Sequence, residues 1–341
     1  MTDRLLWDGR PYHSLDYEMK HRFGEKIYKV ALEAGMTCPN RDGTLDTRGC
    51  SFCSGAGSGE FAISNVHLEN SGIEVCHGHT SNTKARPASI TEQINEGIRF
   101  VSRQKKTGRR YIAYFQSFTN TYAPIEKLES LYREALAHPD IVMLSVATRP
   151  DCLPEDVISL LQECSQIKPV MVELGLQSIH GRTARHIRRG YPTAVYDTAV
   201  ESLKNAGMEV VTHVIAGLPG ENKNDFLQTV EHVAECGSDG IKLQLLHVLE
   251  GTDLSCEYRN GQFSVLTMKE YLDWIVSAIQ ILPKEMVIHR LTGDGPKDLL
   301  IAPLWSGNKR HVLNSLHKKM KEEHIYQGQI TRSVCQQKGK Q

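Results

Sequence analysis

Three cysteines lie within one short segment and have the spacing of ligands for a metal centre. Cys38, Cys50 and Cys53 stand in the run CPNRDGTLDTRGCSFC, which begins at Cys38. The Cys-x2-Cys pair presents two thiols on one tight loop, and the third thiol comes from just upstream. Iron–sulfur clusters normally take four thiolate ligands. Three thiolates on one loop therefore predict a cluster with one iron left open for another molecule, which suits catalysis better than electron transfer.

A zinc site is the alternative interpretation of the same cysteines. Cys-x2-Cys is also half of a zinc-binding motif. Cys76 and His79 have the Cys-x2-His spacing of a second half. Structural zinc bound by Cys50, Cys53 and this second pair would leave Cys38 unused and would not account for the rest of the chain. Both interpretations stay open at this point, with the cluster favoured.

Composition places these cysteines in a reducing setting. The chain has 341 residues, and its nine cysteines are scattered along it. Residues 1–10 are polar and do not resemble a secretory signal, and no apolar stretch has the length of a membrane span. We therefore expect a cytoplasmic protein without membrane contact, whose cysteines bind metal rather than form disulfides. The formal net charge is zero, so any nucleic-acid-binding surface must be local.

Short apolar runs alternate with longer amphipathic segments between residues 27 and 250. Strands are expected at 27–32, 111–116, 141–147, 170–177, 209–215 and 240–246. Helices are expected at 90–106, 124–138, 154–166, 223–236 and as a pair across 181–207. This alternation predicts an α/β fold with parallel strands joined by right-handed crossovers. Six units are too few for a closed eight-fold barrel, so we expect a doubly wound sheet or a partial (βα)6 TIM-like barrel.

The alternation stops near residue 250. A strand-like segment at 286–290, the run TGDGP from Thr292 and a basic helix near 308–321 follow. We interpret residues 1–26 as an N-terminal segment, 27–250 as the barrel and 251–341 as a C-terminal extension. The polar segment 64–86 could form a lid after the cysteine motif.

Polar side chains gather where the expected strands end, which is the edge that carries the active site in both architectures. Six polar residues are the candidates to face a substrate: Gln116, Asn120, Arg149, His213, Lys242 and His247. Each of them could equally be a satisfied core or rim residue. His213 and Lys242 are the most informative because they interrupt apolar strands.

The cysteine loop followed by this strand pattern resembles the radical S-adenosylmethionine (SAM) superfamily, although its spacing is wider than the commonest motif, C-x3-C-x2-C. It looks like the branch that includes the radical SAM domain of Elongator-type tRNA-modifying proteins. Further blocks resemble one bacterial and plant subgroup: FQSFTNTYAP from Phe115, ATRPDCLP from Ala147, VELGLQS from Val172, HVIAGLPGE from His213, LLHVLEGT from Leu245 and HRLTGDGP from His289. The likeness runs from about residue 24 to residue 316.

The resemblance implies a [4Fe–4S] cluster on the three cysteines, with SAM chelating the fourth iron. One electron, from an external donor such as flavodoxin or ferredoxin, would cleave SAM to methionine and a 5′-deoxyadenosyl radical that abstracts hydrogen from the substrate. Under this interpretation five further residues become candidates for binding the cofactor: Phe52, Glu173, Gln177, Arg189 and Gly217.

These five residues would have different roles. Phe52 could pack on the adenine and screen the cluster from water. Glu173 and Gln177 share one face of a strand, and an acidic side chain inside an apolar strand favours a site role. Arg189 could bind the SAM carboxylate or lie on a solvated helix face. Gly217 would allow the backbone to approach the adenosine.

The subgroup is associated with modification of the wobble uridine of tRNA. The implied reaction removes the carboxymethyl group from 5-carboxymethylaminomethyluridine and leaves 5-aminomethyluridine. The sequence shows no acetyltransferase domain, which argues against a carboxymethylating role. Basic runs at 103–110, 182–189 and 309–321 could track a tRNA backbone. We therefore expect the tRNA anticodon stem-loop as the partner, with the C-terminal extension as a possible contact.

Two other function classes compete with this interpretation. One is a radical SAM enzyme that acts on a small molecule or a peptide. The other is a zinc-stabilised tRNA-binding module without redox chemistry, which would be colourless where an iron–sulfur protein is brown.

Overall fold

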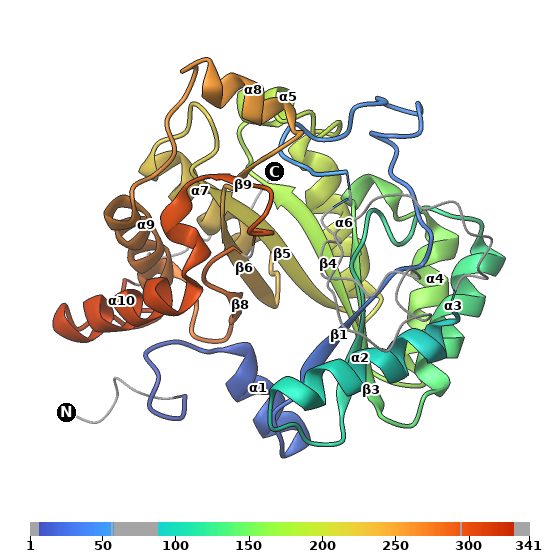
Figure 1. Ribbon diagram of the computed structural model, residues 1–341. Coiled ribbons are helices and arrows are strands. Elements are labelled where there is room, and N and C mark those ends of the chain that lie inside the picture. Colours follow the sequence, from blue (N-terminus) through green and yellow to red (C-terminus); the bar gives the residue numbers. More distant parts are fainter. Residues whose placement is uncertain (1–6, 56, 58–87, 294, 331–341) are drawn as a thin grey trace, which may run out of the picture.

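Seven parallel strands form one curved sheet that is the frame of the molecule (Figure 1). The computed structural model describes residues 7–55, 57, 88–293 and 295–330. The strands pair in the order β1-β2-β3-β4-β5-β6-β8, with β1 and β8 at the two edges. Their bounds are β1 Tyr28–Leu32, β2 Tyr111–Phe115, β3 Ile141–Thr148, β4 Val170–Gln177, β5 Glu209–Ala216, β6 Gly240–Leu245 and β8 Val287–Arg290. The expected partial barrel is confirmed, with one strand more than the six that the sequence pattern predicted.

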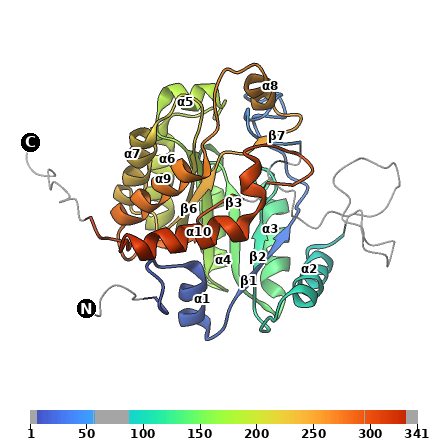
Figure 2. The same cartoon turned by 60° about the vertical axis from the view of Figure 1, so that its left-hand side comes forward.

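Helices cover the outer, convex face of the sheet (Figures 1 and 2). The helices that follow the strands are α2 Ile90–Gln104, α3 Ile125–Ala137, α4 Glu155–Ser165, α5 Gly181–His186, α6 Thr193–Asn205, α7 Lys223–Glu235 and α9 Met268–Ile281. Capping boxes begin α2 at Ser89, α7 at Asn222 and α9 at Thr267. Helices α3 and α4 each begin one residue later than the expected ranges, because Pro124 and Pro154 are their N-cap residues.

The core lies between the sheet and these helices. Leu144, Val172 and Val214 of the central strands are fully buried and join one large apolar cluster with the inner faces of the helices. Strands that are covered on both sides must be apolar along most of their length, which is why the sequence pattern located them within a residue or two. Charged side chains on the concave side of these strands are therefore exceptional.

The remaining elements come from the two ends of the chain. Helix α1 (Leu15–Phe23) precedes β1, and α8 (Asp253–Arg259) and α10 (Lys309–Glu322) follow β6. A small antiparallel pair joins β7 (Val248–Leu249) to β9 (Leu300–Ala302). β8 pairs in parallel with β6, so the sheet takes a strand from beyond residue 250. The division at that residue stays a prediction.

Two other expectations concern segments at the limits of the structure. No helix in the described part of the chain combines the length and the apolar character that crossing a membrane requires. The predicted lid at 64–86 lies outside the described residues, and so do Cys76 and His79 of the zinc alternative.

Candidate active site

A cavity of about 240 Å³ opens where the strands of the half-barrel end. Among the site residues expected from the sequence, Asn120 and Gly217 do not line it; Asn120 is buried and donates to the carbonyl oxygens of Phe115 and Ala147 at 3.1 and 3.0 Å. The others line it: Cys38, Cys50, Phe52, Cys53, Gln116, Arg149, Glu173, Gln177, Arg189, His213, Lys242 and His247. The fold therefore brings together residues that are more than 200 positions apart in the chain, because the carboxyl ends of parallel strands share one edge.

The cysteine loop is attached to the chain that follows α5. The Asn40 side chain donates to the carbonyl oxygen of Arg188 at 2.6 Å and to the sulfur of Cys50 at 3.4 Å. Arg188 in turn donates from Nε to the carbonyl oxygen of Gly49 at 2.8 Å, and Ser51 donates its backbone N–H to Ile187 at 3.2 Å. These bonds hold the Cys-x2-Cys turn against the barrel rim.

The three thiols fit a cluster better than a single ion. The one described group of three ligand atoms within 4.8 Å of one another lies elsewhere, so the sulfurs of Cys38, Cys50 and Cys53 are spread more widely. A tetrahedral zinc ion with Zn–S bonds of about 2.3 Å would hold its sulfurs about 3.8 Å apart. Burial, together with Cys53, raises the pKa of the Cys50 thiol to about 12. A thiolate at this position therefore requires a bound cation.

Glu173 is the centre of a buried ionic network on the concave face of the sheet. Its side chain has no solvent exposure. It accepts hydrogen bonds from five side chains: Lys29 and Ser145 (2.8 Å) at Oε1, and Tyr114 (3.0 Å), His213 (2.7 Å) and Lys242 at Oε2. The ammonium groups of Lys29 and Lys242 also lie 4.6 and 4.8 Å from the ring centre of Tyr114. A single carboxylate thus pairs with two lysines from opposite halves of the sheet, Lys29 of β1 and Lys242 of β6.

The protonation states follow from this arrangement. Burial alone would raise the pKa of Glu173, but Lys242 and Lys29 hold the pKa of this carboxyl well below its usual range. Burial lowers the pKa of His213 to about 4 and that of Lys242 to about 7. His213 is therefore neutral near pH 7. Its bond to Glu173 requires the proton on Nε2, which leaves Nδ1 as an acceptor.

Gln177 offers an unsatisfied group to a ligand. Its φ of +62° departs from the strand conformation at the end of β4. Its Oε1 is buried and has no hydrogen-bond partner among the described residues. Gln177 lines the cavity close to Glu173, as the shared strand face predicted. A cavity-lining residue whose amide oxygen lacks a donor could bind a ligand with hydroxyl or ammonium groups such as SAM.

Arg189 is buried at the cavity and does not lie on a solvated helix face, which was one of the two roles expected for it. The solvated helix face is wrong, because Arg189 is only 3% exposed. Its guanidinium makes five hydrogen bonds, with the carbonyl oxygens of Leu176, Ser178 and Tyr191 and with Thr193 Oγ1. Arg189 therefore attaches the start of α6 to the end of β4. Binding of the SAM carboxylate stays a prediction, and it would require an exchange of some of these bonds.

Gly217 has a role that the sequence did not suggest. It has a φ of +84°, and a Cβ atom there would lie 3.0 Å from Cγ of Leu266. Since Gly217 does not line the cavity, its small size serves the packing of Leu266 over the turn after β5. Contact with adenosine stays a prediction that the cavity lining does not support.

The remaining predicted residues form the walls. Phe52 packs beside Ile215 and Leu218 in a small apolar cluster, so it can screen the cysteine loop from water. His247 lies directly under Gly293, where any Cβ atom would overlap its ring. The glycines of the TGDGP run thus let the chain pass over His247. Gln116 lines the cavity next to these walls.

Sequence reasoning missed several residues of the site, among them Lys29, Tyr114 and Arg290. Lys29 interrupts an apolar strand in the same way as Lys242, so the same signal could have found it. Arg290 ends a strand whose place in the sheet was not predicted. Tyr114 carries no such signal, because tyrosine is common in buried strands.

The comparisons with known proteins agree with this site. Residues 47–233 match the family described as the radical SAM superfamily, and residues 238–322 match the Radical_SAM C-terminal domain. YtqA of Bacillus subtilis (strain 168), described as uncharacterized, is 40% identical over 319 residues, which are 94% of this chain and 92% of YtqA. The tRNA uridine(34) acetyltransferase of Methanocaldococcus jannaschii is 28% identical over 187 residues, which are 54% of this chain and 33% of that protein.

A solved structure shows the same fold. The archaeal Elp3 of Methanocaldococcus infernus, with residues 1–46 deleted, matches with a TM-score of 0.63 at 17% identity, covering 88% of this chain and 64% of that one. The family match extends over more than half of the chain, and the identity to YtqA extends over nearly all of it. The chain is also similar to Elongator complex protein 3 of Schizosaccharomyces pombe, at 23% identity over 83% of this chain and 55% of that protein. It therefore belongs to the radical SAM superfamily and is an enzyme of the kind that uses SAM and a [4Fe–4S] cluster.

Proposed function

We propose that this enzyme removes the carboxymethyl group from 5-carboxymethylaminomethyluridine at the wobble position of tRNA and leaves 5-aminomethyluridine. The observation that carries the proposal is the similarity of the radical SAM region to a protein named tRNA uridine(34) acetyltransferase, since position 34 is the wobble position. The archaeal Elp3 fold supports the same class of substrate.

The charges of the cavity favour a substrate that carries a carboxylate. Among the described lining residues, five cationic side chains stand against one carboxylate, Glu173: Arg41, Arg149, Arg189, Lys242 and Arg290. Arg149 is paired with Asp151 at 2.7 Å, and Lys242 with Glu173. Positive charge remains for the carboxylates of SAM and of a carboxymethyl group.

The reaction balances with SAM as the two-electron oxidant, so no further oxidant is needed. SAM bound to the cluster would supply the 5′-deoxyadenosyl radical, which takes one hydrogen atom from the methylene between the amine and the carboxylate. Loss of one electron from that carbon gives an iminium, and water hydrolyses it to the free amine and glyoxylate. The electron that cleavage of SAM consumes is matched by the electron that the substrate radical releases.

His213 and Lys242 are the residues that we propose to act on the substrate side. Neutral His213 presents Nδ1 as an acceptor, which could orient the attacking water. Lys242, with its pKa lowered to about 7, can hold or release a proton near neutral pH, so it could protonate the departing amine. Gln116 and His247 complete the wall that they share. The anticodon loop suits entry into this cavity because its bases are unpaired and leave the stack at low cost.

The test is anaerobic turnover with tRNA from a strain that accumulates 5-carboxymethylaminomethyluridine. We expect 5-aminomethyluridine, glyoxylate and 5′-deoxyadenosine in equal amounts, and no product with the Cys50→Ala variant. The electron donor is supplied as a reduced flavodoxin or as a chemical reductant. Formation of deoxyadenosine with a peptide or metabolite, but not with tRNA, would support the alternative of a small-molecule or peptide enzyme. Wobble nucleosides unchanged in a strain that lacks the protein would contradict the proposal.

A further inference from the structure

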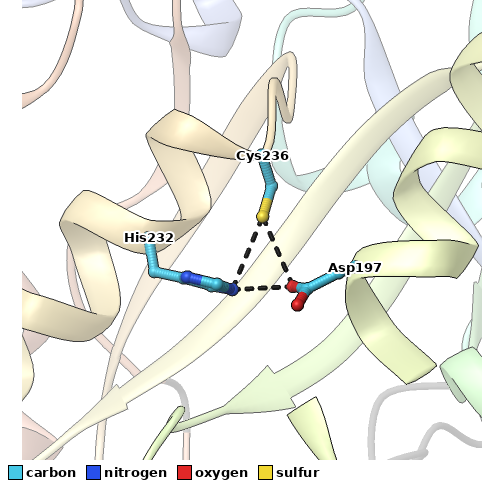
Figure 3. A group of neighbouring side chains, drawn as sticks. All are labelled: Asp197, His232 and Cys236. Carbon is cyan, nitrogen blue, oxygen red and sulfur yellow. Dashed lines mark hydrogen bonds and ion pairs between the residues drawn. The ribbon is translucent and has the colours of Figure 1, made fainter. Parts of the chain in front are cut away.

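Asp197, His232 and Cys236 form a compact group on the outside of the barrel (Figure 3). Asp197 lies on α6, His232 lies on α7, and Cys236 is the C-cap residue of α7. None of the three lines the cavity described above. Their three side chains point toward one another between α6 and α7.

The three ligand atoms nearly form the face of a metal tetrahedron. His232 Nε2 lies 2.7 Å from Asp197 Oδ1, and Cys236 Sγ lies 3.4 Å from Asp197 Oδ1 and 3.5 Å from His232 Nε2. Zinc bonds of about 2.0–2.3 Å to oxygen, nitrogen and sulfur separate such atoms by about 3.3–3.6 Å. Only the nitrogen–oxygen pair would have to open, by about 0.6 Å.

The way in which the imidazole is used distinguishes a metal site from a catalytic relay. In a relay, the carboxylate bonds to one ring nitrogen and the nucleophile to the other. Here both Asp197 and Cys236 face the same nitrogen, His232 Nε2. The three groups therefore converge on one point. His232 and Cys236 can do so because residues four apart share one face of a helix.

We propose that Asp197, His232 and Cys236 bind a zinc ion, with water as the fourth ligand. A thiolate, an imidazole and a carboxylate together favour zinc over magnesium or calcium. The group is accessible, since the side chains of Asp197 and His232 are 43% and 27% exposed, so the ion and the water can enter. The ion would join α6 to α7. The cavity-lining Arg189 donates to Thr193 at the start of α6. A zinc ion that fixes α6 against α7 would therefore also support this wall of the cavity.

Zinc binding should release a proton. The unperturbed pKa of a cysteine thiol is about 8.5. The thiol is therefore protonated at neutral pH and must lose its proton to become a ligand. Calorimetry in buffers with different ionisation enthalpies should show about one proton released from this thiol per zinc ion bound.

The experiment uses the full chain with its cluster assembled anaerobically and with loosely bound metal removed by a chelator. Zinc is titrated in competition with a chromophoric chelator. We expect one zinc ion per chain beyond the cluster iron, and a loss of affinity of about 100-fold in Cys236→Ser, because even changes behind the ligands weaken metal binding 10–100-fold. Cys256→Ser is the matched control, because Cys256 is another cysteine of the same half of the chain, exposed and outside the group. It should bind zinc as the wild type does.

Cobalt gives a second readout that is independent of affinity. The wild type minus Cys236→Ser difference spectrum should contain a thiolate-to-cobalt charge-transfer band. Zinc should raise the melting temperature of the wild type but not of Cys236→Ser or His232→Gln. Unchanged iron content and circular dichroism show that the variants fold. Equal zinc affinity in the wild type and Cys236→Ser, or a cobalt spectrum without thiolate character, would overturn the proposal, whatever the outcome for tRNA.

Discussion

At the scale of the residue, Glu173 has two roles, one in the cavity and one in the stability of the buried ionic network. From the sequence it was a candidate for binding SAM, and it does line the cavity. The structure adds a second demand, because Lys29 and Lys242 are buried and need its charge. Removing one partner of such a buried group commonly costs about 3–5 kcal/mol. A loss of activity in a Glu173 variant would therefore combine cofactor binding with stability, whereas Gln177 reports on binding alone.

Each of Cys38, Cys50 and Cys53 should be essential for the cluster. Replacing any one of them with Ala should abolish iron binding and SAM cleavage, because each thiolate holds one iron and none is spare. The measurement is iron content and visible absorbance after anaerobic reconstitution. Cys256→Ala and Cys76→Ala should keep the full iron content. Iron lost by the Cys76 variant but kept by the Cys38 variant would show that the ligands are assigned wrongly.

His213 should make the folded protein sensitive to mild acid. Its pKa is lowered from 6.5 to about 4, chiefly by burial, so between these values the unfolded chain binds a proton that the folded chain does not. The stability that depends on neutral His213 is complete above pH 6.5 and is lost as the pH falls toward 4, by up to about 3 kcal/mol. His213→Gln, which keeps a donor for Glu173, should flatten the dependence of the unfolding free energy on pH. His311→Gln, at an exposed position, controls for the substitution; equal slopes in all three proteins would refute the assignment.

At the scale of elements, the basic runs of the sequence differ in how many of their side chains are already bound by acidic partners within the protein. The run at 182–189 is largely engaged: Arg182 pairs with Asp225 at 3.1 Å, Arg188 pairs with Asp253 at 2.6 Å, and Arg189 is buried. In α10, Lys319 is bound to Asp273 of α9 and to Glu323. A basic helix thus serves partly to attach itself to the barrel. The tRNA surface must be sought among exposed cations that do not attach α10 to the barrel.

Neutralising Lys309, Arg310 and Lys318 together should weaken tRNA binding. Each lost phosphate contact should lower the slope of log affinity against log salt by about one unit. The measurement is filter binding at several salt concentrations. Lys319 is left in place, because its loss would detach α10 from α9. The matched comparison is the exposed set on the other side of the molecule, Arg103, Lys105 and Lys106 near the end of α2 (Figure 1). If only that variant loses slope, α10 does not contact tRNA.

Gly217→Ala should destabilise the protein without altering SAM affinity. The left-handed backbone disfavours a Cβ atom by about 1–2 kcal/mol, and the contact with Leu266 at 3.0 Å adds crowding. The unfolding free energy should therefore fall by about 2 kcal/mol or more in urea titrations. The Gly217→Ala, Leu266→Ala double variant should lose less stability than the sum of the two single variants, because removing the Leu266 side chain relieves the crowding. A weakened affinity for SAM with unchanged stability would restore the predicted role beside the adenosine.

At the scale of the whole molecule, the two ends of the chain are tied together at the edge of the sheet. Gln327 is fully buried. It accepts from the backbone N–H of His13 at 2.8 Å and donates to the carbonyl oxygens of Pro283 and Met286, the latter at 2.8 Å. His13 also accepts from the backbone N–H of Ile288 in β8. One amide therefore joins the N-terminal segment, the loop before β8 and the chain after α10.

Replacing Gln327 with Met should destabilise the protein by about 2–4 kcal/mol, because three buried backbone groups lose their partner while the volume is kept. A single cooperative urea transition at a lower midpoint is the expected result, since the three segments belong to one folding unit. Gln329→Met, at an exposed position two residues on, should change little. A separate early transition in the Gln327 variant would show instead that the C-terminal segment unfolds independently.

The local features of this protein are encoded in its amino-acid sequence. Apolar runs alternating with amphipathic segments predicted six strands, because both faces of a parallel sheet are buried. The spacing of Cys38, Cys50 and Cys53 predicted a shared metal centre, because close ligands must lie on one loop. The long-range contacts became visible in the folded structure, in which Lys29 and Lys242 share one carboxylate and β8 completes the sheet. Those contacts join segments far apart in the chain, and no local pattern encodes which distant side chains meet.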